Sequence, residues 1–186
     1  LGSSTHFYLR AALRYIGLDP EKDMTILQLG AGPEVALALE TGKIAAATMN
    51  IRNALTFLQR NWPMFVDLTK TDLIYPSSCV TSSRAFVKAE PRLVEDFLAG
   101  YNAAIQLIKK DASVTQRSLS KWTRENDAAI LGKTIEAHSR IFNSPPYVPD
   151  KGIESVIKDL ATRRAVAKEF IGHPELFRDN GPLERA

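Results

Sequence analysis

Apolar residues recur at helical spacing near the start of the chain and again through its second half. Leu9, Ala12, Leu13 and Ile16 repeat every three to four residues, and Gly17 follows as a stop signal. Longer stretches of the same periodicity begin near Pro91, Val114, Asp127 and Asp150. The pattern therefore predicts a helix directly after Thr5 and a helical segment that spans residues 86–186.

Short apolar runs rich in β-favouring residues separate the helical stretches of the first part. They cover residues 24–29, 44–49, 64–68 and 79–82. Short strands that alternate with helices of about ten residues favour βαβ units and a mainly parallel sheet. We therefore expect an α/β lobe over residues 1–85, followed by the helical segment.

Three polar groups are expected at one edge of this sheet. Ligands of parallel sheets lie beyond the carboxyl ends of the strands, near the starts of the following helices. Residues 2–5, 30–34 and 49–53 all fall at such positions in the predicted order of elements. Asn50 is placed to cap the predicted helix that follows it and runs through Leu58.

The tetrapeptide Gly2-Ser3-Ser4-Thr5 is the strongest candidate for chemistry. The start of a helix leaves backbone N–H groups without partners and carries about half a positive charge. The hydroxyl groups can cap these donors, or they can turn outward with the donors and hold an anion. Both interpretations remain open at this point, and Gly2, Ser3, Ser4, Thr5 and Asn50 are the candidate ligand-binding residues.

Composition excludes several other classes of function. Apolar residues make up 45% and charged residues 24% of the 186 residues, which is ordinary for a globular protein. The net charge of +3 and the lack of a run of five basic residues give no reason to expect nucleic acid as a partner. The single cysteine, Cys79, has no partner for a disulfide or a zinc site, and no dinucleotide-binding or metalloprotease motif occurs. We expect no cofactor and no metal, and no apolar run is long enough to span a bilayer.

The sequence offers no catalytic pair of nucleophile and base. Cys79 lies in an apolar run, where a thiol packs as a small hydrophobe. His6 is one helical turn from the candidate edge, and we interpret it as a solvated or packed histidine, with a ligand contact as the alternative. His138 is expected at a helix surface. We therefore predict that the protein is not an enzyme and assign no catalytic residue.

The order of elements also indicates that the chain is part of a longer protein. The first helix follows no strand, although every later helix of the first part does. The helical segment contains no sheet that its apolar sides could cover. We expect that an upstream segment with strands supplies both.

Several of these stretches, in this order, resemble one family. They are Gly2-Ser3-Ser4-Thr5, Gly17-Leu18-Asp19-Pro20, Gly30 with the stretch at 36–43, Asp67-Leu68-Thr69, Ser83-Arg84, the stretch at 97–101, and Pro145-Pro146-Tyr147-Val148-Pro149. The order and spacing resemble the periplasmic solute-binding proteins of ABC importers, in the subgroup for nitrate, sulfonate, taurine and thiamine-precursor pyrimidines. The resemblance covers roughly residues 1–165.

The resemblance implies a type II periplasmic-binding fold with two lobes and a solute in the cleft between them. This chain would be the second half of such a protein, with its helical segment returning to the first lobe. The implied partners are a small polar or anionic solute and the membrane permease of an importer, and the implied location is periplasmic or anchored outside the cytoplasm. Two alternatives remain: an enzyme on the same scaffold, similar to a pyrimidine synthase or a desulfinase, and the effector-binding domain of a transcriptional regulator.

Overall fold

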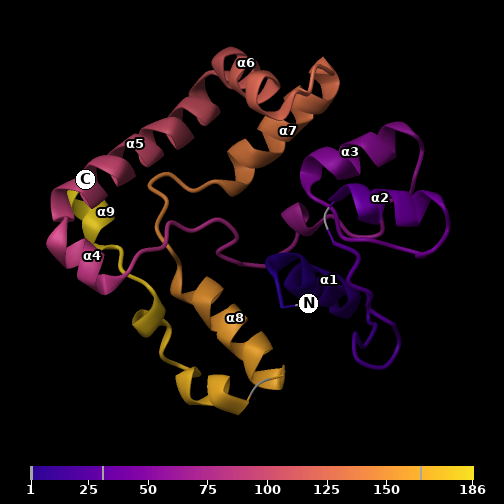
Figure 1. The fold of residues 1–186 in the computed structure, drawn as a ribbon, viewed down its shortest axis with the longest axis horizontal. Coiled ribbons are helices and arrows are strands. Elements are labelled where there is room, and N and C mark those ends of the chain that lie inside the picture. The colour runs from indigo at the N-terminus through magenta and orange to yellow at the C-terminus, as the bar shows by residue number, and fades with distance from the viewer. Residues whose placement is uncertain (1, 31, 164) are drawn as a thin grey trace. The chain divides into compact units, whose positions relative to one another are not determined.

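The chain folds into two compact units, and each is described by itself (Figure 1). The first unit spans Leu1–Leu73 and the second spans Ile74–Ala186. This computed structural model describes residues 2–30, 32–163 and 165–186, and in these ranges it describes all side chains except those of residues 163–167. The first unit contains the helices α1 (Ser4–Tyr15), α2 (Gly32–Glu40) and α3 (Ile51–Gln59) and the short 3₁₀ helix η1 (Leu68–Lys70).

The second unit is also built from helices. In chain order they are α4 (Arg84–Ala89), α5 (Pro91–Lys110), α6 (Ala112–Thr123), α7 (Ala128–Ile141), α8 (Asp150–Arg163), η2 (Ala165–Phe170), η3 (Pro174–Phe177) and α9 (Gly181–Arg185). Among the described residues, no helix is both long enough and apolar enough to cross a bilayer.

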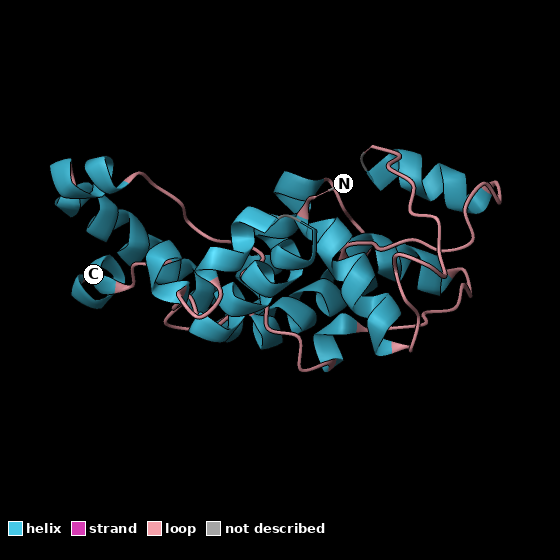
Figure 2. Ribbon diagram, turned by 90° about the horizontal axis from the view of Figure 1, so that it is seen from below, coloured by secondary structure: helices cyan, strands magenta, loops and turns pink. Residues whose placement is uncertain are grey.

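The expected α/β fold is wrong. Figure 2 shows helices joined by loops, and none of the described residues forms a strand. The four predicted strands, at residues 24–29, 44–49, 64–68 and 79–82, are irregular segments, and residue 68 begins η1. The type II periplasmic-binding architecture that the resemblance implied, with its mainly parallel sheet, is therefore not the fold of the described residues.

The reason for this error lies in how strands are stabilised. A strand satisfies its backbone N–H and C=O groups only through a neighbouring strand, and a short apolar run does not reveal whether such a neighbour exists. Here several large apolar side chains of these runs remain exposed, among them Leu27, Phe65 and Val80. Without a partner strand or a covering layer, β-favouring residues alone do not produce a sheet.

The helices of the first unit begin and end where local signals place them. The predicted helix after Thr5 is confirmed as α1, and Gly17 takes a positive φ of 84° just beyond its end. Phe7, Arg10 and Leu13 form the buried side of α1. Arg10 is only 2% exposed and forms an ion pair with Glu21, which compensates the cost of burying its charge.

One part of the core of the second unit lies between α5, α6 and α7, and a second part lies at α8, where Ile157 and Ala161 are buried. Helices α5, α6 and α7 pack pairwise, and Ile105, Ile130, Leu131 and Ile135 are buried. Aspartates cap two of them: Asp111 accepts hydrogen bonds from two backbone N–H groups of α6, and Asp127 accepts two from α7. The predicted helix starts near Pro91, Asp127 and Asp150 are confirmed.

The C-terminal elements of the second unit pack onto its longer helices. The short helix α9 lies on α5, where Arg185 Nε is 2.7 Å from Glu95 Oε1. Arg178, just beyond η3, holds Asp150 at the start of α8 through a two-contact ion pair. These ion pairs tie the end of the chain to α5 and α8.

Candidate functional site

The start of α1 presents Gly2, Ser3, Ser4 and Thr5 as a short polar segment. Ser3 is the N-cap residue, with φ −83° and ψ 173°, and its carbonyl accepts the first helical hydrogen bond from Phe7 N at 3.1 Å. Its hydroxyl makes no capping hydrogen bond. Ser3 therefore occupies the N-cap position, but its side chain does not accept a hydrogen bond from the first-turn N–H groups as a capping serine does.

The hydroxyl groups of this segment are uncommitted. Among the described residues, the side chains of Ser3, Ser4 and Thr5 make no hydrogen bond, and the side chains of Ser3 and Thr5 are exposed while that of Ser4 is half-buried. The first-turn N–H groups of any helix lack intrahelical partners. The start of α1 therefore combines backbone and hydroxyl donors that solvent can reach.

A bond between Gly2 and His6 holds the segment in place. Gly2 has a positive φ of 89°, and its N–H donates to His6 Nδ1 at 3.1 Å. Because Nδ1 accepts this bond, the neutral ring carries its proton on Nε2. His6 was expected to be solvated, packed or in contact with a ligand. In the structure its ring accepts a hydrogen bond from the backbone just before α1 and so holds that backbone in place.

The electrostatics of the helix starts differ among the three expected groups. The first turn of α1 contains no acidic residue, so its positive end is not neutralised locally. In α2 the first turn contains Glu34, whose negative charge offsets the positive end of the helix and disfavours an anion there. In α3 the first turn also lacks acidic residues, but the helix start is already capped. The Asn50 side chain accepts a hydrogen bond from the backbone N–H of Asn53 at 2.9 Å.

The structure brings two of the three groups together. A Cβ atom on Gly32 would lie 2.9 Å from Asn53 Nδ2, so the start of α2 touches the first turn of α3. Ala31, within the group at residues 30–34, lies outside the described residues. No hydrogen bond or ion pair of the described residues joins residues 2–5 to either of these groups. The starts of α2 and α3 are thus in contact, and no hydrogen bond or ion pair of the described residues adds the start of α1 to them.

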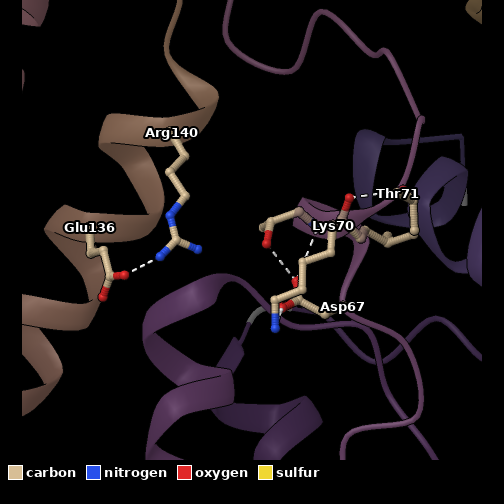
Figure 3. A network of polar contacts seen from close by, with 7 residues as sticks. Asp67, Lys70, Thr71, Glu136 and Arg140 are labelled. Atoms are coloured by element: carbon tan, nitrogen blue, oxygen red, sulfur yellow. Dashed lines mark hydrogen bonds and ion pairs between the residues drawn. The ribbon is translucent and has the colours of Figure 1, made fainter.

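The segment around Asp67 has a structural task (Figure 3). Asp67 Oδ1 accepts from the backbone N–H of Thr69 at 3.0 Å and from its hydroxyl at 2.6 Å, and Lys70 Nζ lies 3.2 Å from Oδ2. Burial alone would raise the pKa of Asp67, but the hydrogen bonds from Thr69 and Lys70 outweigh it and lower the pKa. The Asp67 carboxylate therefore caps η1. Figure 3 also shows a separate ion pair, between Glu136 and Arg140 of α7 in the second unit.

Cys79 lacks the environment of a reactive thiol. It lies at the surface and donates a weak hydrogen bond to the carbonyl of Pro76 at 3.4 Å. The protein atoms around the thiol displace enough water to raise its pKa. Nucleophilic cysteines instead have lowered pKa values, set by nearby cations or helix starts.

The other side chains with catalytic or metal-binding chemistry are also occupied or dispersed. His138 Nδ1 lies 2.8 Å from the carbonyl of Thr134, and its ring packs edge-on against Phe142. Across the described ranges, no group of three or more His, Cys, Asp and Glu side chains is arranged to hold a metal ion. Comparison of the sequence and the structure with protein families, with curated proteins and with solved structures finds no match.

Proposed function

We propose that this protein binds a small anionic or strongly polar solute at the start of α1, as the solute-binding component of an ABC importer. The observation that carries the proposal is the unused N-cap: Ser3 stands in the cap position, yet its hydroxyl caps nothing. The importer assignment depends on the order and spacing of the sequence motifs alone, because the fold that the resemblance implied is not the one found.

The chemistry of this segment suits an anion. A positive φ at Gly2 turns the chain so that the next residues begin a helix, and a glycine permits this conformation at little cost. Backbone N–H donors and hydroxyl donors then lie together at the positive end of α1. Hydroxyl groups rotate to suit the geometry of the bound group, which favours an oxyanion or a sulfonate.

The enzyme alternative finds no support in the chemistry around Cys79. A desulfinase or a pyrimidine synthase would need a reactive cysteine or a site with cysteine and histidine ligands. The raised pKa of Cys79 leaves its thiol protonated at neutral pH. The Nδ1 atoms of His6 and His138 both form hydrogen bonds with backbone groups.

Titration calorimetry with nitrate, taurine and a thiamine-precursor pyrimidine tests the proposal. Hydrogen bonds to a charged group contribute about 1.5–3 kcal/mol each. Loss of one hydroxyl should therefore weaken binding roughly 10–100-fold. We expect one of the three solutes to bind, and single Ala substitutions at Ser3, Ser4 and Thr5 to weaken that binding.

Ser83→Ala is the matched control, because Ser83 is the N-cap of α4 and its hydroxyl does accept from Phe86 N at 3.1 Å. This variant should lose some stability and keep its affinity for the solute. If Ser3→Ala, Ser4→Ala and Thr5→Ala all keep the affinity of the unaltered chain within twofold, the assignment of the site is wrong. Failure of all three solutes to bind at millimolar concentration would overturn the proposed function itself.

A further inference from the structure

Helix α5 has an inner apolar stripe that the second unit uses for its own packing. This stripe contains Val94, Leu98, Tyr101, Ile105 and Ile108, and Ile105 is buried. Polar contacts on the same side join α5 to its neighbours: Lys109 Nζ donates to the carbonyl of Ser139 at 2.6 Å, and Glu95 pairs with Arg185. The inner side of α5 is therefore covered by α7 and α9.

A second apolar stripe, which we call the outer stripe, lies on the exposed side of α5. It consists of Leu93, Phe97, Gly100, Ala104 and Leu107, which follow one another at intervals of four, three, four and three residues. All five are exposed, and the three large side chains are 57%, 56% and 45% exposed at Leu93, Phe97 and Leu107. Alternation of three and four residues is the spacing of a seam between two paired helices.

The middle of the outer stripe allows another helix to approach closely. Gly100 and Ala104 lie one turn apart and have little or no side chain, and small residues at this spacing let two helix backbones come near each other. A Cβ atom on Gly100 would meet no atom within 4 Å, so the space above it is open. Large side chains toward both ends and small ones in the middle shape the stripe for a second helix.

Charged residues beside the outer stripe favour a second α5 helix in antiparallel orientation as the partner. Asp96 and Lys110 flank the same side of the stripe, one in the first half of α5 and the other at its last residue. Both are exposed, and neither forms an ion pair within the described ranges. In an antiparallel pair of α5 helices, Asp96 of each copy would face Lys110 of the other. In a parallel pair, the charged flanks of the two copies would lie on opposite sides of the seam, and these charges would not meet.

We propose that two copies of this chain associate through the outer stripes of α5, packed antiparallel. Phe97 of each copy lies against Leu107 of the other, and Gly100 lies against Ala104. Arg92, one turn before Asp96, falls beyond the end of the opposing helix and contributes no pair. The proposal depends on α5 alone and is independent of the solute site on α1.

The expected association is reversible and of moderate strength. A helix of 20 residues is about 30 Å long. One pair of such helices is at the lower end of the size of specific interfaces, so we expect a dissociation constant on the order of 10 µM. Sedimentation equilibrium of the 186-residue chain from about 1 to 200 µM should show a monomer–dimer equilibrium.

A charge-swap cycle provides the decisive test. Asp96→Lys and Lys110→Asp should each weaken dimerisation about tenfold, because each replaces two attractive contacts by two repulsive ones. The double variant restores opposite charges and should return the dissociation constant to within about threefold of that of the unaltered chain. Lys121→Asp, at an exposed lysine of α6, is the matched control and should leave dimerisation unchanged.

Two results would overturn the proposal. One is a monomer over the whole concentration range, which would indicate that another part of the same chain covers the outer stripe. The other is a double variant that stays as weak as the single variants. Rescue by the double variant cannot arise from misfolding of the single ones, and circular dichroism of each variant provides an independent check.

Discussion

The unused cap at Ser3 leads to a prediction about stability. Replacing an N-cap Ser, Thr, Asp or Asn by Ala costs about 1 kcal/mol when the side chain caps the helix. Ser3 makes no such bond, so Ser3→Ala should change the free energy of unfolding of the first unit by less than about 0.3 kcal/mol. Asn50→Ala, in the same unit, removes a bond of 2.9 Å to Asn53 N and should cost about 1 kcal/mol.

Urea unfolding followed by tryptophan fluorescence measures this difference. The chain has two tryptophans, and each unit contains one. Trp62 is half-buried and packs edge-on against Phe57 at 5.2 Å, so its emission reports unfolding of the first unit. Trp122 in the second unit is 77% exposed and should change little.

The magnitude is large enough to observe. With a slope near 1–2 kcal/mol per molar urea for a small unit, Asn50→Ala should lower the unfolding midpoint by about 0.5–1 M. Ser3→Ala should leave the midpoint unchanged within error. Equal losses in the two variants would show that the Ser3 hydroxyl caps α1 in solution and is not free to bind a solute.

Three further predictions concern other parts of the chain. Thr134 is buried, and its hydroxyl has no hydrogen-bond partner among the described residues, so Thr134→Val should leave the thermal midpoint unchanged or raise it; a clear decrease would reveal a hidden partner. Cys79→Ser should leave solute affinity within twofold in calorimetry, and loss of a measurable turnover on this change would favour an enzyme instead. The pKa of Asp67 is lowered in the folded state, so its contribution to stability is present above its ordinary pKa and is lost as the pH falls below about 4. Urea midpoints of the unaltered chain and of Asp67→Asn should therefore differ at pH 7 and approach each other as the pH falls below about 4, and a constant difference would contradict this assignment.

The positions of helices could be predicted from the sequence because their signals are local. Asn50 and Asp127 cap the helices that follow them, and Pro91 begins α5, as the pattern of polar and apolar residues indicated. A capping side chain and the residues it caps are at most three positions apart, so one short stretch contains the whole interaction.

The strands could not be predicted correctly because pairing depends on residues far away in the sequence. The run at residues 24–29 has the composition of a buried strand, yet Met24 and Leu27 are exposed and no neighbouring strand is present in the described residues. Composition alone does not distinguish a strand with a partner from an irregular apolar segment. The α/β lobe therefore failed as a prediction, while the residues described after position 86 do form helices.

The candidate site could be predicted only in part. The glycine and three hydroxyl residues located the start of α1, but their spacing fits both a cap and an anion site. Only the structure shows that Ser3 does not cap while Asn50 does. The bond from Gly2 N to His6 Nδ1 also escaped prediction, although a histidine four residues after a glycine at a helix start offers a signal for it.

The most direct test of the proposed function is an NMR titration of the 186-residue chain with nitrate, taurine and a thiamine-precursor pyrimidine. We predict that one of these solutes shifts the backbone amide signals of Ser4 and Thr5 in a saturable way, more than it shifts the signals at the starts of α2 and α3. Ser3→Ala should raise the concentration at which this shift saturates. Saturable shifts that are confined to other helices, with Ser4 and Thr5 unmoved, would contradict the assignment of solute binding to the start of α1.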